Sequence, residues 1–224
     1  MSVGLGLSLG AARLSRRTPW VLFGMGVLLV LCVGALERMS EPAYALDRAL
    51  LGVAFGLALP LFCYLVFESV LAERGLPGLV LPLQRHGADA RTLSFGIVMA
   101  LTAVCAAAGV VFSLGALLVT VGFGPAFSRE LLPCIWGGAA AGFAYAGLFA
   151  FASRFRRLGR LSVLFGDWLL GAGSGVLALP FPRGHVRSLF GGEAVLDLSQ
   201  LDALAFLVLI AFAGTLASAA FGRH

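Results

Sequence analysis

The sequence predicts an all-α polytopic membrane protein with six transmembrane helices and both termini in the cytoplasm. Three observations lead to this fold class. First, hydrophobic residues make up 60% of the 224 residues and charged residues only 12%, about half the charged share of a soluble domain. Second, the apolar runs are about 17–29 residues long and do not alternate with polar residues, which favours helices over a barrel. Third, the arginines gather in alternate loops.

Six apolar runs are predicted to cross the bilayer as helices. They cover residues 20–36, 49–67, 93–121, 131–151, 161–179 and 201–220. The third is long enough to tilt or to extend beyond the bilayer. Residues 1–18 are expected to be a cytoplasmic or interfacial segment, with a short helix carrying Leu5, Leu9 and Leu14. No small-x-small cleavage site follows the first run, so we expect an uncleaved signal anchor.

The arginines give the predicted helices an orientation. All 16 basic residues are Arg, and eleven of them fall in the termini and in the loops after the second and fourth spans. The other loops hold five, together with most of the acidic residues. Because short cytoplasmic loops are enriched in basic residues, both ends are predicted to be cytoplasmic. The net charge of +5 then reflects this bias and not a nucleic-acid partner. The absence of Lys, with abundant Ala, Gly and Leu, suggests the inner membrane of a bacterium.

Enzymatic chemistry is not predicted. The four cysteines are widely spaced in or beside apolar runs, so no metal site, cofactor site or disulfide framework is expected. No Walker-type phosphate loop occurs. The glycine-rich stretch around Ser174 has no partner for a Ser–His dyad, because His86, His185 and His224 fall in loops or the tail. We expect His185 in a solvated outer loop. The whole chain, 1–224, is taken as one transmembrane domain.

Residues 68–91 form the most polar internal segment, yet apolar residues persist between its charges. Such a segment is expected to lie along the membrane surface or against a partner. Its order of motifs resembles the type-2 ABC exporter permease family. The matching residues are Glu73-Arg74-Gly75, Leu81-Pro82, Arg85, Arg91 and, early in the third span, Gly96. The basic loop after the fourth span is also similar and contains Arg154, Arg156, Arg157 and Arg160. Pro77 and Gly78 depart from the family pattern and predict an interruption of the helix there.

The resemblance implies a permease subunit without catalysis of its own. Such a subunit pairs with a second copy or a paralogue in the membrane, and a separate ATP-binding subunit docks beneath it. Residues 68–91 would then be the coupling segment, with the coupling residues Glu68, Glu73, Arg74, Gly75, Arg85 and Arg91. The substrate is not predicted, nor is the choice between homodimer and heterodimer.

Asp167 is the one acidic residue well inside an apolar run, and a charge within a bilayer is costly. It is therefore a candidate either for the transport pathway or for a structural ion pair. Two other classes stay open: a membrane scaffold or accessory subunit outside the ABC family, and a gradient-driven carrier. A carrier would usually show broken helices or several intramembrane ionisable residues.

Overall fold

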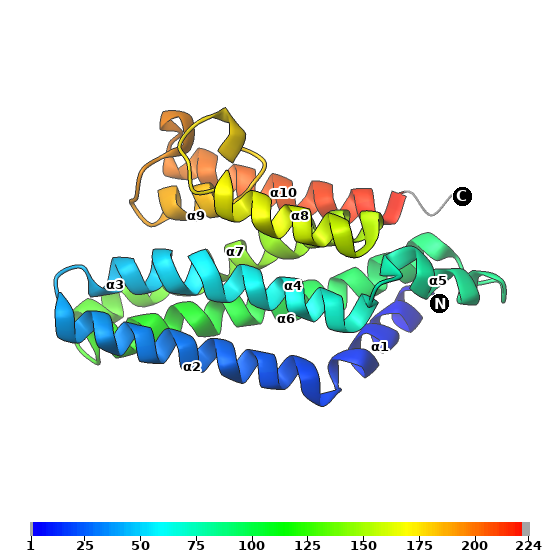
Figure 1. Ribbon diagram of the computed structural model, residues 1–224, viewed down its shortest axis with the longest axis horizontal. Coiled ribbons are helices and arrows are strands. Elements are labelled where there is room, and N and C mark those ends of the chain that lie inside the picture. Colours follow the sequence, from blue (N-terminus) through cyan, green and yellow to red (C-terminus); the bar gives the residue numbers. More distant parts are fainter. Residues whose placement is uncertain (1, 221–224) are drawn as a thin grey trace.

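A computed structural model describes residues 2–220 of the chain. No strand occurs among the described residues, so the all-α prediction is confirmed. The helices run roughly parallel or antiparallel to the long axis of the molecule (Figure 1). The start of α1 (Ser2–Leu14) and the end of α10 (Gln200–Ala220) lie at the same end of the bundle. We call this end the basic end.

Five helical runs are long and apolar enough to cross a membrane. They contain the predicted spans at 20–36, 49–67, 93–121, 131–151 and 201–220. The first is α2 (Arg17–Ser40) and the third α6 (Ala90–Val121). The fourth begins with α7 (Pro125–Ala152) and continues to Leu169, and the last is α10. At 32 residues, α6 is about 48 Å long and extends beyond a hydrocarbon core of about 30 Å. The chain thus has the helices of a multi-pass membrane protein.

The second run contains a long π-helix near its start. A short helix, α3 (Ala45–Asp47), leads into the π-helix η1 (Arg48–Ala58), which continues as α4 (Leu59–Leu71). π-Helices are rare and usually last a single turn. The apolar pattern of this run does not distinguish it from an ordinary helix, and the π-helix was not predicted.

Glycines bring α6 and α7 into backbone contact at the centre of the bundle. A Cβ on Gly109 would collide with the backbone of Gly138, and one on Gly142 would collide with the backbone of Cys105. At the same crossing, the Ser113 hydroxyl donates to the Cys134 carbonyl oxygen at 2.8 Å. Small residues let membrane helices approach closely, and here they bring the backbones of α6 and α7 together.

The prediction of a fifth transmembrane helix over 161–179 is wrong beyond Leu169. After α7, the 3₁₀ turn η2 (Ser153–Phe155) and Arg156 (φ 61°) reverse the chain into α8 (Arg156–Leu169). At 14 residues, α8 is about 21 Å long, too short to cross alone. Residues 170–175 are irregular and lead to the 3₁₀ turn η3 (Val176–Ala178). The count of six complete spanning helices is therefore not confirmed.

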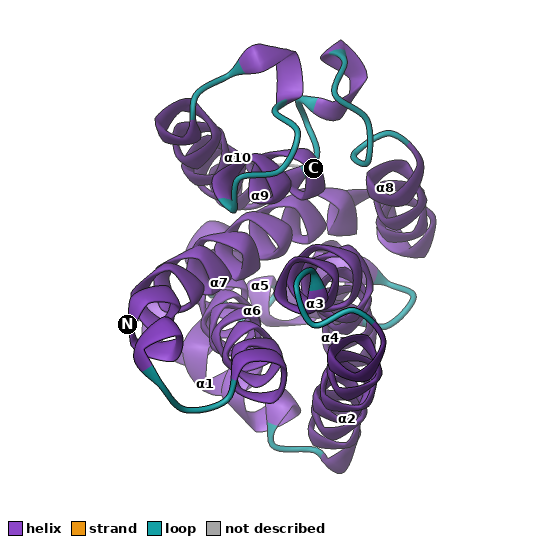
Figure 2. Ribbon diagram, turned by 90° about the vertical axis from the view of Figure 1, so that its left-hand side faces the viewer, coloured by secondary structure: helices purple, strands orange, loops and turns teal. Residues whose placement is uncertain are grey.

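The segment between α8 and α10 folds back onto the bundle. It contains α9 (Pro182–Leu189) and the 3₁₀ turn η4 (Val195–Asp197), and Figure 2 shows α9 beside α10. His185 on α9 is fully buried and stacks on Phe206 of α10 at 4.9 Å between ring centroids. The expectation of a solvated loop around His185 is wrong, because packing against η1, α7 and α10 buries this part of the loop.

The first helix, α1, packs on the basic end of α6 through its glycines, and Leu14 and Leu9 pack in or against the core. Leu5 is 45% exposed, whereas Gly6 and Gly10 are buried. A Cβ on Gly6 would meet the backbone of Leu93, and one on Gly96 would meet the backbone of α1. The interfacial helix predicted for residues 1–18 is thus docked against the bundle.

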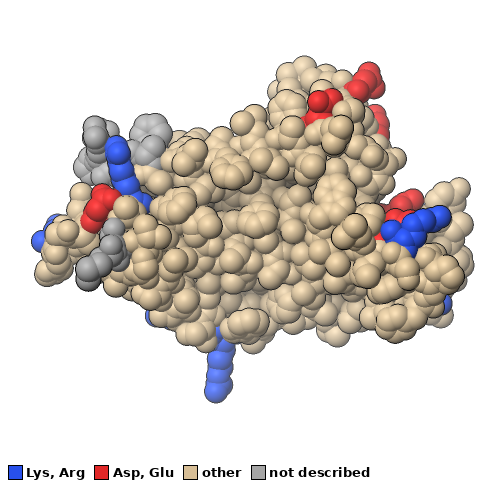
Figure 3. Space-filling model, turned by 180° about the vertical axis from the view of Figure 1, so that it is seen from behind, with Lys and Arg blue, Asp and Glu red and all other residues tan. Residues whose placement is uncertain are grey.

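Charged side chains gather at two ends of the molecule. On the face in Figure 3, acidic and basic side chains lie at the left and right, and one basic side chain projects from the lower edge. Apart from that side chain, a broad band between the ends is uncharged on this face (Figure 3). This distribution suits a bilayer, because the hydrocarbon core excludes unpaired charge.

Candidate functional site

Two segments that the sequence singled out, 68–91 and 154–160, meet at the basic end. Glu68 is in the last turn of α4, and Glu73 follows in the turn before α5 (Gly75–Gln84). Arg157 and Arg160 are in the first turns of α8. Ion pairs join these four side chains, and we call them the basic-end cluster.

Arg160 is the centre of the basic-end cluster. Its side chain is 0% exposed, and its Nη2 donates to Glu68 Oε2 at 2.6 Å. Nε donates to the same oxygen at 3.1 Å. The other carboxylate oxygen of Glu68 lies 3.7 Å from Arg157 Nε, and Arg157 Nη1 lies 3.8 Å from Glu73 Oε1. A buried guanidinium needs a partner to offset its desolvation, so Glu68 and Arg160 fix α4 and α8 relative to one another.

The same arginine holds an unusual turn at the end of α4. Arg160 Nη2 also donates to the Ala72 carbonyl oxygen at 2.6 Å, and Ala72 adopts φ 53°. A residue with a Cβ rarely takes a positive φ unless its surroundings impose it. The hydrogen bond from α8 therefore helps to set the direction in which the chain leaves α4 for α5.

Gly75 brings the two segments into direct backbone contact. It has φ +66°, and a Cβ there would meet the Ser153 carbonyl oxygen and lie 3.5 Å from the Cα of Arg156. Only glycine combines this backbone conformation with this close approach. The start of α5 therefore abuts the turn between α7 and α8.

The predicted interruption at Pro77 and Gly78 does not occur, because α5 is a continuous helix over both residues. Pro77 is the third residue of α5, within the first turn, where a backbone N–H has no partner inside the helix. Pro is therefore tolerated at this position.

The other predicted coupling residues surround the cluster without joining it. Arg74, Arg85 and Arg91 are exposed, as is Arg156 at the start of α8. Arg154 is partly buried and lines a cavity beside α5. The structure thus separates a paired group that ties helices together from a set of surface cations around it.

Asp89, near the end of residues 68–91, caps the start of α6. Its carboxylate accepts from the backbone N–H of Thr92 at 3.2 Å and of Arg91 at 3.4 Å. These hydrogen bonds, chiefly those from Thr92, lower the pKa of Asp89 below its ordinary value. The start of α6 is thus defined by a charged N-cap.

Asp167 forms a second buried group nearer the opposite end of the bundle. Its carboxylate is 1% exposed, accepts from the Tyr145 hydroxyl at 2.9 Å and accepts from the Arg183 backbone N–H at 3.2 Å. The Tyr145 hydroxyl also lies 3.4 Å from the Phe55 carbonyl oxygen of the π-helix. Asp167 thereby connects α7, α8, α9 and η1, an arrangement that fits a structural role.

The sequence did not identify Tyr145, which contacts Asp167, or Arg13, which contacts the end of α4. Tyr145 lies within an apolar run, where nothing distinguishes it from a packing residue. Arg13 of α1 donates from Nη1 to the Val70 carbonyl oxygen of α4 at 2.6 Å, so α1 also holds the end of α4. Both contacts depend on which helices become neighbours, and a single sequence does not contain that information.

The described residues contain no group of three or more His, Cys, Asp or Glu that could hold a metal ion. Comparisons of the chain with protein-family models, with curated proteins and with solved structures find no match. The resemblance to type-2 ABC exporter permeases therefore rests on the motifs quoted above and stays a prediction.

Proposed function

We propose that this protein is the membrane-spanning permease subunit of an ATP-driven exporter in a bacterial inner membrane. A separate ATP-binding subunit would dock on α5 at the basic end, and a second permease copy or a paralogue would complete the transporter. One observation supports the proposal most: the buried Glu68–Arg160 pair and the Gly75–Ser153 contact join the coupling segment to α4, α7 and α8. A surface helix must be tied in this way if movement of a docked ATPase is to move the spans.

The outward side of α5 has the character of a docking face. Arg74, Pro82 and Arg85 are exposed along it, with cations at both ends of the helix. Charges at the rim of an interface select the partner and fix register more than they add affinity. The expected partner surface therefore carries acidic residues around an apolar centre.

The proposed topology has six crossings and both termini in the cytoplasm. The basic end is then the cytoplasmic face. The fifth crossing is incomplete as a helix, because α8 ends at Leu169 and the irregular segment and α9 fill the remaining depth. Backbone that is not helical is tolerated at membrane depth where protein surrounds it. Val176 and Leu177 are exposed in the single chain, so this topology requires the second permease copy to cover the segment.

Copurification with the ATPase encoded beside its gene tests the proposal. We expect the two proteins to copurify, and charge reversal at Arg74 and Arg85 together to abolish the association. Charge reversal at Arg129, an exposed arginine at the opposite end, is the matched control and should leave the association intact. If no ATPase copurifies with the wild type, or if the control weakens binding equally, the proposal is wrong.

A gradient-driven carrier is the second candidate, because the interruption after α8 lies close to a buried acid, Asp167. Broken helices with intramembrane carboxylates are typical of such carriers. Substrate transport in vesicles separates the two classes. A carrier transports without ATP and loses transport in Asp167→Asn, whereas the exporter requires ATP whatever gradient is applied.

A further inference from the structure

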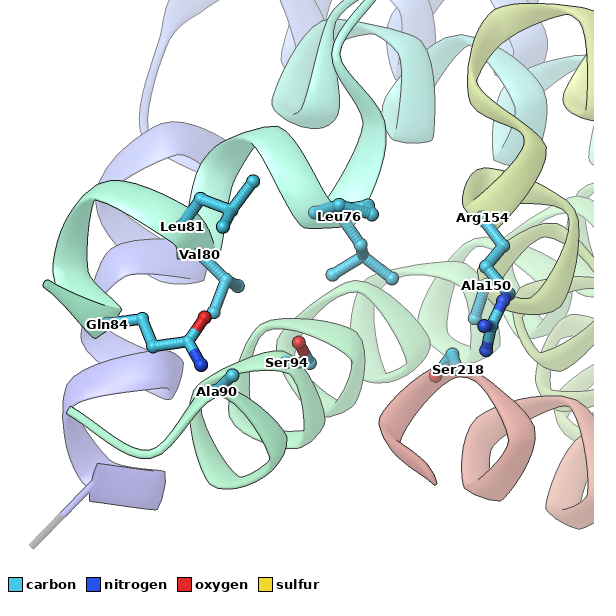
Figure 4. Close-up of a pocket in the computed structure, with 10 residues that line it drawn as sticks. Leu76, Val80, Leu81, Gln84, Ala90, Ser94, Ala150, Arg154 and Ser218 are labelled. Atoms are coloured by element: carbon cyan, nitrogen blue, oxygen red, sulfur yellow. The ribbon is translucent and has the colours of Figure 1, made fainter. Parts of the chain in front are cut away.

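A cavity at the basic end lies outside the network described above. It opens between α5, the start of α6, the end of α7 with η2, and the end of α10, and its volume is about 200 Å³ (Figure 4). Pockets for drug-sized ligands measure about 300–1,000 Å³. This cavity therefore fits a smaller group, such as the polar head of a larger molecule.

Part of the cavity lining is polar and carries a positive charge. Its polar lining comes from the side chains of Gln84, Ser94, Arg154 and Ser218. Figure 4 shows the Arg154 side chain extending towards Ser218, with Gln84 at the other side of the cavity. None of the described residues that line the cavity is acidic. A guanidinium has five N–H donors, so Arg154 can keep its existing interaction and still bind an anion.

The rest of the lining is apolar and reaches the surface. Leu76 and Val80 of α5 are buried in its wall, and Leu81 at its rim is 46% exposed. A free inorganic anion gains nothing from such a wall. An anionic lipid is stabilised by both parts of the lining, because its phosphate contacts the arginine and its glycerol and chains contact the leucines.

We propose that this cavity binds the phosphate head group of an anionic membrane phospholipid, with Arg154 as the phosphate-binding residue. The inference goes beyond the proposed export function and depends only on the basic end lying at the membrane surface. A lipid there would contact α5, α6, α7 and α10 at once. It would stabilise the position of α5 against the bundle.

Native mass spectrometry of the purified chain tests the site without any ATPase. The chain is released from mixed micelles holding phosphatidylglycerol and phosphatidylcholine in equal amounts. We expect one phosphatidylglycerol per chain to be retained in preference to phosphatidylcholine. Arg154→Gln should lower its occupancy about tenfold, because one charge-assisted contact is lost. Arg156→Gln removes an exposed arginine two residues away and should change nothing.

A second variant keeps the charge and fills the space. Ser94→Leu places a larger side chain in the cavity, and we expect it to lose the lipid while Arg154 is retained. This variant tests the site even if Arg154→Gln does not fold. The proposal is overturned if both variants retain the lipid, or if Arg156→Gln loses it equally. It is also overturned if inorganic phosphate alone occupies the site as well as phosphatidylglycerol does. None of these results bears on whether an ATPase docks.

Discussion

At the scale of single residues, the Glu68–Arg160 ion pair lies at the centre of the basic-end cluster. Arg160 is fully buried, while Glu68 retains 22% exposure. The sequence identified both as candidates, because one lies in the polar segment and the other in the basic loop. Their pairing could not be predicted, since 92 positions separate them and several arginines in that loop were equally plausible partners.

Glu68→Gln should destabilise the protein by about 3 kcal/mol, because it leaves a buried guanidinium without its counter-charge. Glu73→Gln is the matched control. Glu73 is 82% exposed and its ion pair is long, so the loss should stay below about 1 kcal/mol. The free energy of unfolding, measured by titration with sodium dodecyl sulfate, distinguishes the two. Equal losses would show that burial of Arg160 does not matter.

Gly75 and Gly87 provide a second comparison at this scale. Both have positive φ, but a Cβ on Gly87 would meet nothing within 4 Å. Gly87→Ala should cost about 1–2 kcal/mol from backbone strain. Gly75→Ala adds a collision with the Ser153 carbonyl oxygen and should cost clearly more. If both variants shift the melting temperature equally, the close contact between α5 and η2 is not tight.

At the scale of elements, apolar length predicted the spans wherever the helix continued. It failed at 161–179, because hydropathy sums apolar side chains and does not report where the backbone stops being helical. Gly171, Gly173 and Gly175 lie in this run, and Pro180 closes it. The π-helix was missed for a related reason, since its composition is that of any apolar helix.

The docking of α1 is testable through two glycines on the same helix. Gly6→Val should displace α1 from α6, because the new side chain meets the Leu93 backbone. Gly4→Val is the control, since nothing lies within 4 Å of a Cβ there. Displacement exposes the bond after Arg13, so trypsin should cleave Gly6→Val faster at this position. Equal cleavage of both variants would mean that α1 is not held by this contact.

At the scale of the whole molecule, the long helices alternate in direction, and the start of α1 and the end of α10 lie at the same end of the bundle (Figure 1). The chain passes from the basic end to the opposite end and back, and α8 takes part as a short pass (Figure 1). Labelling from one side of the membrane tests which end of the bundle is cytoplasmic.

Single cysteines at three positions, in a Cys32→Ala background, report the topology. The other three native cysteines are buried. A membrane-impermeant maleimide applied to spheroplasts should label Phe123→Cys and Gly175→Cys but not Gly87→Cys. Labelling at 123 without 175 would contradict the fifth crossing, the one through α8. Labelling at 87 would invert the orientation.

The Glu68–Arg160 pair also has a consequence for the order of biosynthesis. Glu68 leaves the ribosome 92 residues before Arg160 does. At about 5–20 residues per second, the carboxylate waits roughly 5–20 s for its partner. During that time the first two spans are inserted while the turn after α4 lacks the hydrogen bond that holds it. Residues 68–91 therefore acquire their final position late, and a nascent chain truncated before residue 160 should display α5 in a different, less protected conformation.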